Sequence, residues 1–210
     1  MKPTTLLFQG DSITDAGRNR DRADANQITA LGGGYAALAA AALLSQRPAG
    51  GLEVFNRGIS GNRVTDLLAR WRPDTIHLRP DTLSILIGVN DCWHQQKSDL
   101  GTPQDLFAQV YRLLLEYTRR ELPEVRLVLC EPFALPCGGF QAEWMDDIKA
   151  RAATTRQLAE EFGAAFVPFQ GLFDALAVEA PAEYWLYDGV HPTPGGHQRM
   201  AELWLKAACF

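Results

Sequence analysis

Apolar residues recur along this chain with two different periods, and each period predicts one kind of secondary structure. Short runs rich in Val, Ile, Leu and Phe have the length of buried strands. The predicted strands cover residues 4–9, 53–57, 82–87, 125–130 and 164–168. The chain therefore offers about five strands, each too short to be a buried helix of ordinary length.

Helical patterns fill the segments between these runs. Their apolar residues are spaced three and four positions apart, which places them on one face of a helix. Helices are predicted over residues 33–46, 62–71, 103–119 and 141–162, and a last helix follows Thr193-Pro194 and runs to Ala207. Asn62 is the predicted N-cap of the second helix, because its side chain can accept a hydrogen bond from a free backbone N–H.

Strands that alternate with helices need crossover connections, and these produce a parallel sheet covered on both faces. The pattern therefore predicts an α/β protein, a three-layer α/β/α sandwich with about five parallel strands, in a single domain spanning residues 1–210. Ligands of open parallel sheets bind beyond the carboxyl ends of the strands. The loops that follow the strands are thus the places to look for chemistry.

Composition excludes several classes of protein. The 210 residues are 47% hydrophobic and 21% charged, with a net charge of −5, which is typical of a globular domain and not of a disordered or fibrous chain. The acidic balance and the lack of a Lys/Arg block argue against nucleic-acid and anionic-membrane partners. No apolar run approaches the ~18 residues of a membrane span, and the apolar stretch at the N-terminus is far shorter than the ~7–15 residues of a signal-peptide core. A cytoplasmic location is the resulting expectation.

The cysteines and histidines show no metal-binding pattern. The cysteines Cys92, Cys130, Cys137 and Cys209 form no C-x-x-C pair, and the four histidines are scattered. Reduced thiols are therefore expected, with Cys92 notable only because it adjoins a polar motif. The run Gly32-Gly33-Gly34 lacks the dinucleotide-binding spacing and predicts a turn before a helix.

Two strand-end loops could supply a nucleophile and hydrogen-bond donors. Ser12 lies between the end of the first strand and a predicted helix start, where a hydroxyl meets free backbone N–H groups. The alternative is that Asp11 and Ser12 only cap that helix. In the second loop, Gly58 and Gly61 leave backbone N–H groups accessible to a ligand, although a simple turn explains these glycines equally well.

Two further loops could supply an amide donor and a base. Asn90 follows the third strand and can donate to an oxyanion, or it can form an Asx-turn. Asp188 and His191 are three residues apart, a spacing that lets the carboxylate orient the imidazole. A lone loop histidine is more often merely solvated, but together these loops hold every group that acyl transfer requires.

Four sequence blocks, in order, resemble the SGNH hydrolase superfamily, also called GDSL-type esterases. Within it, the first, second and third blocks with their flanking residues are most similar to carbohydrate acetylesterases such as acetylxylan esterases. The blocks are Gly10-Asp11-Ser12, Gly61, Gly88-Val89-Asn90-Asp91 and Asp188-Gly189-Val190-His191.

This resemblance implies a flavodoxin-like fold and a set of catalytic roles. Ser12 becomes the nucleophile, His191 the general base and Asp188 its partner. The oxyanion hole becomes the Ser12 amide, the Gly61 amide and the Asn90 side chain. Neither a metal ion nor an organic cofactor is implied.

The same resemblance suggests a serine esterase that removes short acyl groups, above all acetyl, from carbohydrates such as acetylated xylan or xylo-oligosaccharides. Trp93, Trp185 and Tyr187 are then candidates for stacking on sugar rings, unless they pack as core or lid residues. Asp15 and Arg63 are candidates for binding polar groups of the substrate, unless they form a structural ion pair.

Other functions and partners stay open on the sequence. A lysophospholipase or thioesterase of the same superfamily shares these blocks, and a non-catalytic sugar- or acyl-binding protein is a second alternative. The expected partner is a small-molecule or oligosaccharide ester. The apolar C-terminal segment, residues 204–210, either docks on a second copy in a homo-oligomer or packs on its own sheet.

Overall fold

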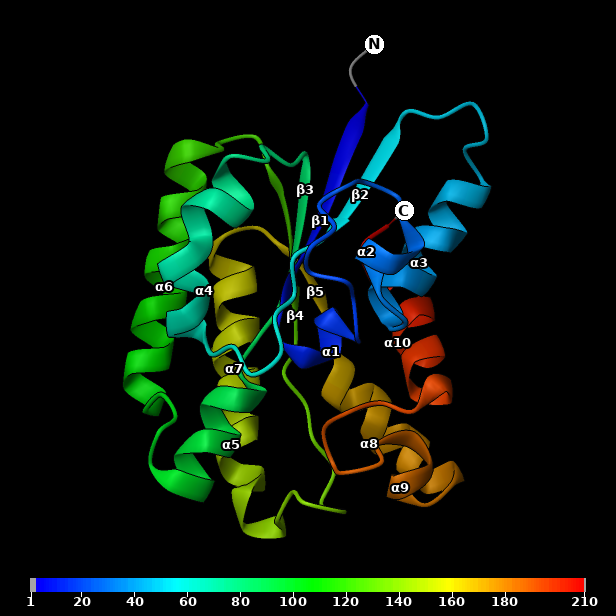
Figure 1. Cartoon of the computed structure of the whole chain (residues 1–210). Helices are drawn as coiled ribbons and strands as arrows, with labels where there is room; N and C mark the ends of the chain where they lie inside the picture. Colours follow the sequence, from blue (N-terminus) through cyan, green and yellow to red (C-terminus); the bar gives the residue numbers. More distant parts are fainter. Residues whose placement is uncertain (1–2, 210) are drawn as a thin grey trace.

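The computed structural model describes residues 3–209, and its centre is one sheet of five parallel strands (Figure 1). The strand order is β2-β1-β3-β4-β5. The strands are β1 (Thr4–Gly10), β2 (Leu52–Asn56), β3 (Thr82–Leu86), β4 (Arg126–Cys130) and β5 (Ala165–Val167). The predicted strands are confirmed, with ends that differ by at most one residue.

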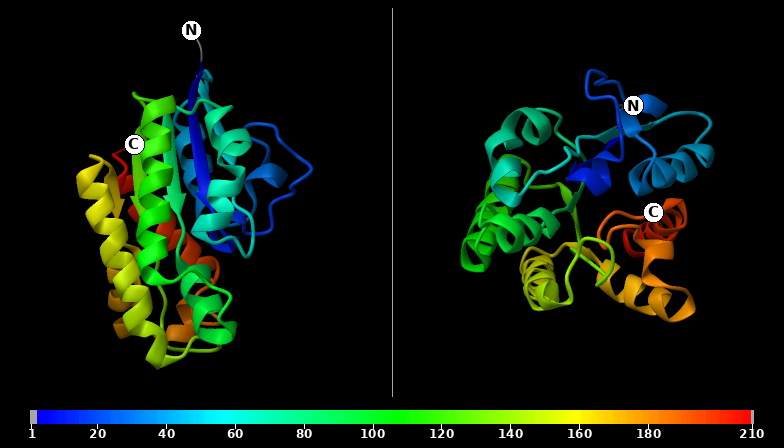
Figure 2. Two further views of the ribbon diagram at one scale, coloured as in Figure 1. Left: turned by 90° about the vertical axis from the view of Figure 1, so that its left-hand side faces the viewer. Right: turned by 60° about the horizontal axis from the view of Figure 1, so that its bottom comes forward.

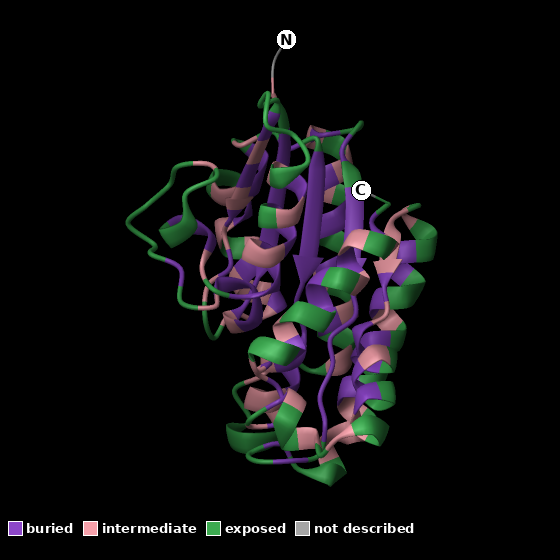
Figure 3. Cartoon of the chain, turned by 90° about the vertical axis from the view of Figure 1, so that its right-hand side faces the viewer, coloured by how far each residue is buried: buried purple, intermediate pink, exposed green. Residues whose placement is uncertain are grey.

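Successive residues of each strand point to opposite faces of the sheet, and both faces are buried. Leu6 and Phe8 belong to one apolar cluster, whereas Leu7 between them belongs to the other. Burial on both sides is the reason that the central strands β1, β3 and β4 are nearly continuous apolar runs. The edge strand β2 instead alternates buried and half-buried residues. Figure 3 shows the strands buried, with the exposed residues on the outer sides of the helices.

Helices form the two outer layers (Figures 1 and 2). The first apolar cluster includes residues of α3, α8 and α10, and the second includes residues of α4 and α6. The helices are α1 (Ser12–Asp15), α2 (Ile28–Leu31), α3 (Tyr35–Ser45), α4 (Val64–Trp71), α5 (Val89–Ser98), α6 (Gln104–Glu121), α7 (Met145–Glu161), α8 (Phe169–Glu179), α9 (Ala182–Trp185) and α10 (Pro194–Ala207). The predicted three-layer sandwich is confirmed.

Several details differ from the sequence prediction. Arg63, not Asn62, is the N-cap of α4, and its N–H donates to Asp66 Oδ2 at 2.8 Å. Asn90 lies in the first turn of α5. This helix was not predicted from the sequence, because its residues are mostly polar. The helices α8 and α9 were also missed, although α8 buries residues at helical spacing.

The C-terminal helix packs on its own sheet. Trp204 is fully buried in the first cluster, and its indole N–H donates to Ser84 Oγ on β3 at 2.9 Å. This contact favours internal packing for that part of the apolar C-terminal segment, while Phe210 lies outside the described residues. Within residues 3–209, no helix combines the length and the apolar character that crossing a bilayer requires.

The topology brings the motif-bearing loops together. The strand β2 lies on one side of β1, and the chain then crosses to β3 on the other side of β1. The direction of winding therefore reverses between β1 and β3. Gly10 at the end of β1 pairs in register with Leu86 at the end of β3. Ser12 and Asn90 therefore start from the same level beside the switch point, where open α/β sheets bind ligands.

Candidate active site

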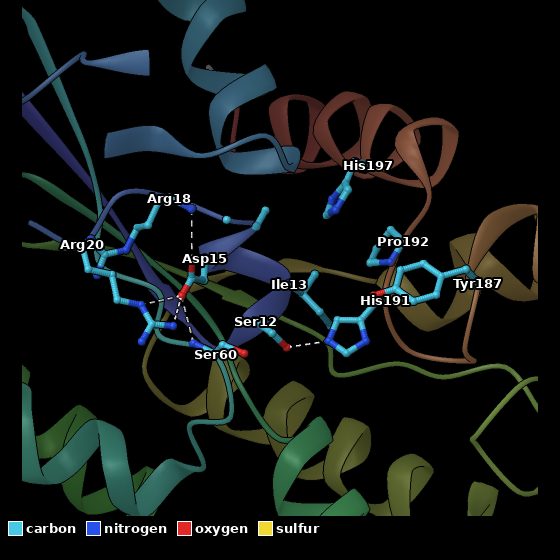
Figure 4. A pocket seen from close by; sticks show the side chains of 12 residues that line it. Ser12, Ile13, Asp15, Arg18, Arg20, Ser60, Tyr187, His191, Pro192 and His197 are labelled. Carbon is cyan, nitrogen blue, oxygen red and sulfur yellow. Dashed lines mark hydrogen bonds and ion pairs between the residues drawn. The ribbon is translucent and has the colours of Figure 1, made fainter. Parts of the chain in front are cut away.

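Ser12 is the first residue of α1 and faces a histidine from the far end of the chain. Asp11 caps this short helix, with Oδ1 accepting a hydrogen bond from the Ile13 N–H at 3.0 Å. Ser12 Oγ lies 2.8 Å from Nε2 of His191 (Figure 4). Capping and exposure of the hydroxyl thus occur together, so the two readings of this loop do not exclude one another.

Asp188 holds the other side of the His191 ring. Its Oδ2 lies 2.7 Å from His191 Nδ1, and its Oδ1 accepts hydrogen bonds from the backbone N–H groups of Val190 at 3.1 Å and His191 at 2.8 Å. Partial burial opposes ionisation, but these hydrogen bonds and the histidine outweigh it and lower the pKa of Asp188. A carboxylate at this position fixes the proton on Nδ1 and leaves Nε2 as an acceptor.

The loop that carries Asp188 and His191 is anchored by the segment after β4. Gly189 has a φ of +96°, and a Cβ there would come within 2.5 Å of the Cys137 carbonyl oxygen. The Gly139 N–H donates to the Asp188 carbonyl at 3.0 Å, and the Leu135 N–H donates to the Gly189 carbonyl at 2.9 Å. A glycine is therefore required where the loop folds the Asp188 carboxylate back onto the imidazole.

Three hydrogen-bond donors lie beside Ser12 Oγ. Within residues 3–209, the backbone N–H groups of Ser12 and Gly61 donate to no protein acceptor. Asn90 Nδ2 donates one hydrogen to the Asn62 carbonyl at 3.1 Å, which leaves its second amide hydrogen available. Ser12, Gly61 and Asn90 line one small cavity, so the structure brings together all three residues predicted as oxyanion donors.

Asp15 joins the first loop to the second. This buried carboxylate accepts hydrogen bonds from the Ser60 N–H at 3.0 Å and the Arg18 N–H at 3.1 Å. It also pairs with Arg20, whose Nε lies 3.0 Å from Oδ2. Asp15 therefore places Ser60, and with it the Gly61 amide, next to Ser12.

The suggested Asp15–Arg63 ion pair is wrong, because each residue has a different partner. Arg63 pairs with Asp66 at 2.9 Å and donates to the Leu100 carbonyl at 2.5 Å, which ties the start of α4 to the end of α5. Trp185 is also placed differently from the expectation of a sugar-stacking residue. Its Nε1 donates to the Leu176 carbonyl at 2.8 Å, and the described cavities beside Ser12 are lined by other residues.

A cavity of about 530 Å³ opens on one side of Ser12 and His191 (Figure 4). Tyr187 lines it and stacks on the His191 ring, with centroids 5.6 Å apart and planes at 17°. Arg20 and Ser60 bring polar groups to the same space. Of these, only Tyr187 was predicted from the sequence; nothing in a lone serine or arginine marks it as facing a cavity.

His197 is a second cavity residue that sequence reasoning missed. It lies in the first turns of α10, and its Nδ1 accepts a hydrogen bond from the Tyr35 N–H at 3.1 Å. Because Nδ1 is the acceptor, the ring proton is on Nε2. Burial, together with the nearby His191, lowers the pKa of His197 to about 4. His197 is therefore a neutral N–H donor at the edge of the larger cavity.

Two buried carboxyl groups lie beneath the site. Burial raises the pKa of Asp11 to about 7, because the hydrogen bond from Ile13 compensates only in part and Asp91 adds repulsion. Asp11 Oδ2 is buried and has no hydrogen-bond partner within residues 3–209. Burial likewise raises the pKa of Asp91 to about 6, against hydrogen bonds from Thr102 and from the Val64 N–H.

The raised pKa of Asp11 makes stability depend on pH. Between its ordinary pKa of 3.8 and about 7, the folded protein retains a proton that the unfolded chain has lost. The free energy of unfolding therefore falls as pH rises through this window, by at most about 1.4 kcal/mol per pH unit for one group. In Asp11→Asn, the part of the fall between pH 6 and 7 should disappear, measured by urea unfolding at each pH. The exposed Asp24→Asn should follow the wild-type profile; an Asp11→Asn profile of wild-type slope would refute the assignment.

Cys92 takes no part in the site. Its thiol is buried, and burial raises its pKa to about 12, so thiolate is scarce at neutral pH. Cys130 and Cys137 are also free and buried, whereas Cys209 is exposed. Across the described part of the chain, no three His, Cys, Asp or Glu side chains are grouped so that they could hold a metal ion.

A five-stranded parallel sheet between helix layers, with these residues at its carboxyl edge, is the three-layer fold of the SGNH hydrolases. The chain belongs to the GDSL-like Lipase/Acylhydrolase family, which residues 8–199 match. The match extends from β1 into α10, so it covers all the loops described above.

Relatives agree with this family assignment over nearly their whole length. An acetylxylan esterase from Geobacillus stearothermophilus is 35% identical over 207 residues, covering 98% of this chain and 94% of the relative. The crystal structure of Axe2, an acetylxylan esterase from that organism, has a TM-score of 0.90 at 33% identity, covering 100% of this chain and 95% of Axe2. A protein from Parabacteroides merdae described as a GDSL-like lipase has a TM-score of 0.95 at 43% identity, covering 99% and 96%.

Proposed function

We propose that this protein is a serine esterase that removes short acyl groups, above all acetyl, from carbohydrate esters such as acetylated xylo-oligosaccharides. The observation that carries the proposal is the hydrogen-bonded chain from Ser12 Oγ through His191 to Asp188, next to three oxyanion donors. Solved structures of Axe2 include catalytic mutants in which a serine and a histidine are replaced by alanine, the two residue types in contact here.

The first half of the cycle makes an acyl-enzyme. His191 Nε2 takes the Ser12 hydroxyl proton while Oγ attacks the ester carbonyl carbon. The negative charge on the carbonyl oxygen is stabilised by the Ser12 and Gly61 amides and the Asn90 side chain, each of which is typically worth ~10²–10³ in turnover. The bond to the alcohol oxygen then breaks, and the alcohol leaves with the proton from Nε2.

The second half releases the acid. A water molecule attacks the acyl carbon and gives its proton to His191 Nε2, and the oxyanion forms against the same donors. The bond between the acyl carbon and Ser12 Oγ breaks, and Oγ takes the proton back from Nε2. Asp188 stays ionised throughout and stabilises the imidazolium that forms in each half.

The larger cavity supports a sugar as the alcohol. Sugar hydroxyl groups need both donors and acceptors, which His197, Ser60 and Arg20 provide, and the exposed Tyr187 ring offers a face for a pyranose. The Geobacillus stearothermophilus sequence relative and the Axe2 crystal structure are both named as acetylxylan esterases, which is consistent with an acetylated saccharide.

A substrate panel tests the proposal and its rivals together. We expect acetate release from acetylated xylo-oligosaccharides, and much weaker cleavage of lysophospholipids and long-chain acyl thioesters. Acid release is measured by titration at constant pH, with the Ser12→Ala variant as the blank for each substrate. Faster turnover of the long-chain substrates would favour the lipid-type esterase, and binding of saccharide without any turnover would favour a binding protein.

A further inference from the structure

Two unlike cavities flank the Ser12–His191 pair. The larger one, of about 530 Å³, holds Arg20 and His197. The smaller one, of about 200 Å³, contains the Gly61 and Asn90 donors. Val89, Trp93 and Val190 form the apolar part of its wall, and Ser60 and His94 also line it. Gly61 and Asn90 thus line only the smaller of these two cavities, and that asymmetry decides how an ester can lie.

The orientation of an ester follows from its three substituents at the acyl carbon. The carbonyl oxygen must point at the donors of Gly61 and Asn90, and the leaving oxygen must lie near His191 Nε2, which protonates it. The polar, larger cavity beyond His191 suits the alcohol. The acyl chain is then directed into what is left of the smaller cavity, toward Trp93.

Trp93 is fixed relative to the donor Asn90 because both belong to the first turns of α5. Residues three apart on a helix share a face, so Asn90 and Trp93 look into the same cavity. The start of α5 is itself held by Asp91, whose two carboxylate oxygens lie 3.1 and 3.2 Å from the Val64 amide nitrogen of α4. The distance from donor to indole is therefore built into one rigid element.

The indole cannot retreat from the cavity. Trp144 meets it edge-on, with ring centroids 5.6 Å apart, and Phe140 lies 6.0 Å away. At Gly139, even an added Cβ would lie only 2.8 Å from the indole Cη2, so the backbone there is in close contact with the ring. A wall supported in this way does not yield to a longer acyl chain without loss of packing.

We propose that Trp93 sets the upper limit on acyl length, so that the protein accepts acetyl and excludes chains of about four carbons or more. The inference rests on the proposed function, since it needs an ester on Ser12. It also replaces the sequence-based role of Trp93: the indole forms the end of the acyl cavity and is not a platform for the sugar.

The experiment compares p-nitrophenyl acetate, butanoate and hexanoate as substrates of Trp93→Leu and Trp93→Ala. The measured quantity is the ratio of kcat/KM for butanoate to that for acetate, which is independent of how much protein folds. Each methylene accommodated in an apolar pocket is worth about tenfold or more in specificity, so the ratio should rise at least about tenfold in both variants. Trp185→Phe changes a tryptophan outside both cavities and should keep the wild-type ratio.

The outcomes separate this inference from the proposed function. An unchanged ratio in an active Trp93 variant overturns the inference and leaves the esterase intact. A raised KM for acetylated xylo-oligosaccharides with an unchanged ratio also overturns it, in favour of a sugar platform. A rise in Trp185→Phe equal to that in Trp93→Leu assigns the effect to general loosening and overturns it as well. Full activity of Ser12→Ala on these esters would instead refute the function itself.

Discussion

Replacing Ser12 with alanine should lower kcat for p-nitrophenyl acetate by about 10⁴–10⁶-fold while leaving the fold intact. The Oγ atom is the only part of the side chain that is lost, and it forms a hydrogen bond with His191 Nε2 at 2.8 Å. The cap of α1 is provided by Asp11 and survives the change. The value of kcat should therefore fall steeply while the melting temperature stays close to that of the wild type.

Ser60 offers a matched control, because it lines both cavities beside Ser12. A fluorophosphonate probe should modify the wild-type protein and Ser60→Ala with one label per chain, located on Ser12 by peptide mass spectrometry. Ser12→Ala should take up none. Labelling and hydrolysis that persist in Ser12→Ala and vanish in Ser60→Ala would move the nucleophile to the second loop and contradict the proposed mechanism.

Replacing Asp188 with asparagine should lower kcat by about 10⁴-fold through the tautomer of His191. An asparagine oxygen can still accept from the His191 and Val190 backbone N–H groups, so the loop should keep its shape. Its amide N–H₂ would then face Nδ1 and force that nitrogen to accept. The ring proton would move to Nε2, which could no longer take the proton of Ser12.

The readouts for Asp188→Asn are kcat, KM and the rate of fluorophosphonate labelling. Labelling should slow along with kcat, because both need the same proton transfer, while KM should change little. Asp146→Asn, a change at an exposed carboxylate of α7, should behave as wild type. A raised KM together with a normal labelling rate would show that Asp188 contacts the substrate and does not act through His191.

Much of the fold could be predicted because burial on both faces of the sheet leaves a local trace in the sequence. Strands such as Thr82–Leu86 and Arg126–Cys130 can be recognised as short apolar runs, and α6 and α10 keep an apolar stripe. The helix α5 could not be recognised in this way. Its buried residues Val89, Asp91 and Cys92 are few, and its other side faces the site, where function and not core packing sets the residue types.

The same distinction separates the residues of the site. Ser12, Asp188 and His191 could be singled out because they stand in short motifs with a chemical reason for their spacing. His197 and Ser60 carry no such mark, since their positions follow from α10 meeting α3 and from Asp15 holding the second loop. Trp93 was predicted as a candidate for stacking on a sugar, because the sequence shows an aromatic ring beside a motif; only the structure shows that it lines the smaller cavity.

By itself the sequence determined the alternation of strands and helices, the family and the candidate residues for the proposed acyl transfer, because each of these depends on nearby residues or on a motif. The tertiary structure alone decided which groups meet. Ser12 and His191 are 179 residues apart in the chain and 2.8 Å apart in space, because parallel strands end at one edge of the sheet. Partners such as Ser84 for Trp204 and the Ser60 N–H for Asp15 also depend on how distant segments pack, which no local pattern encodes.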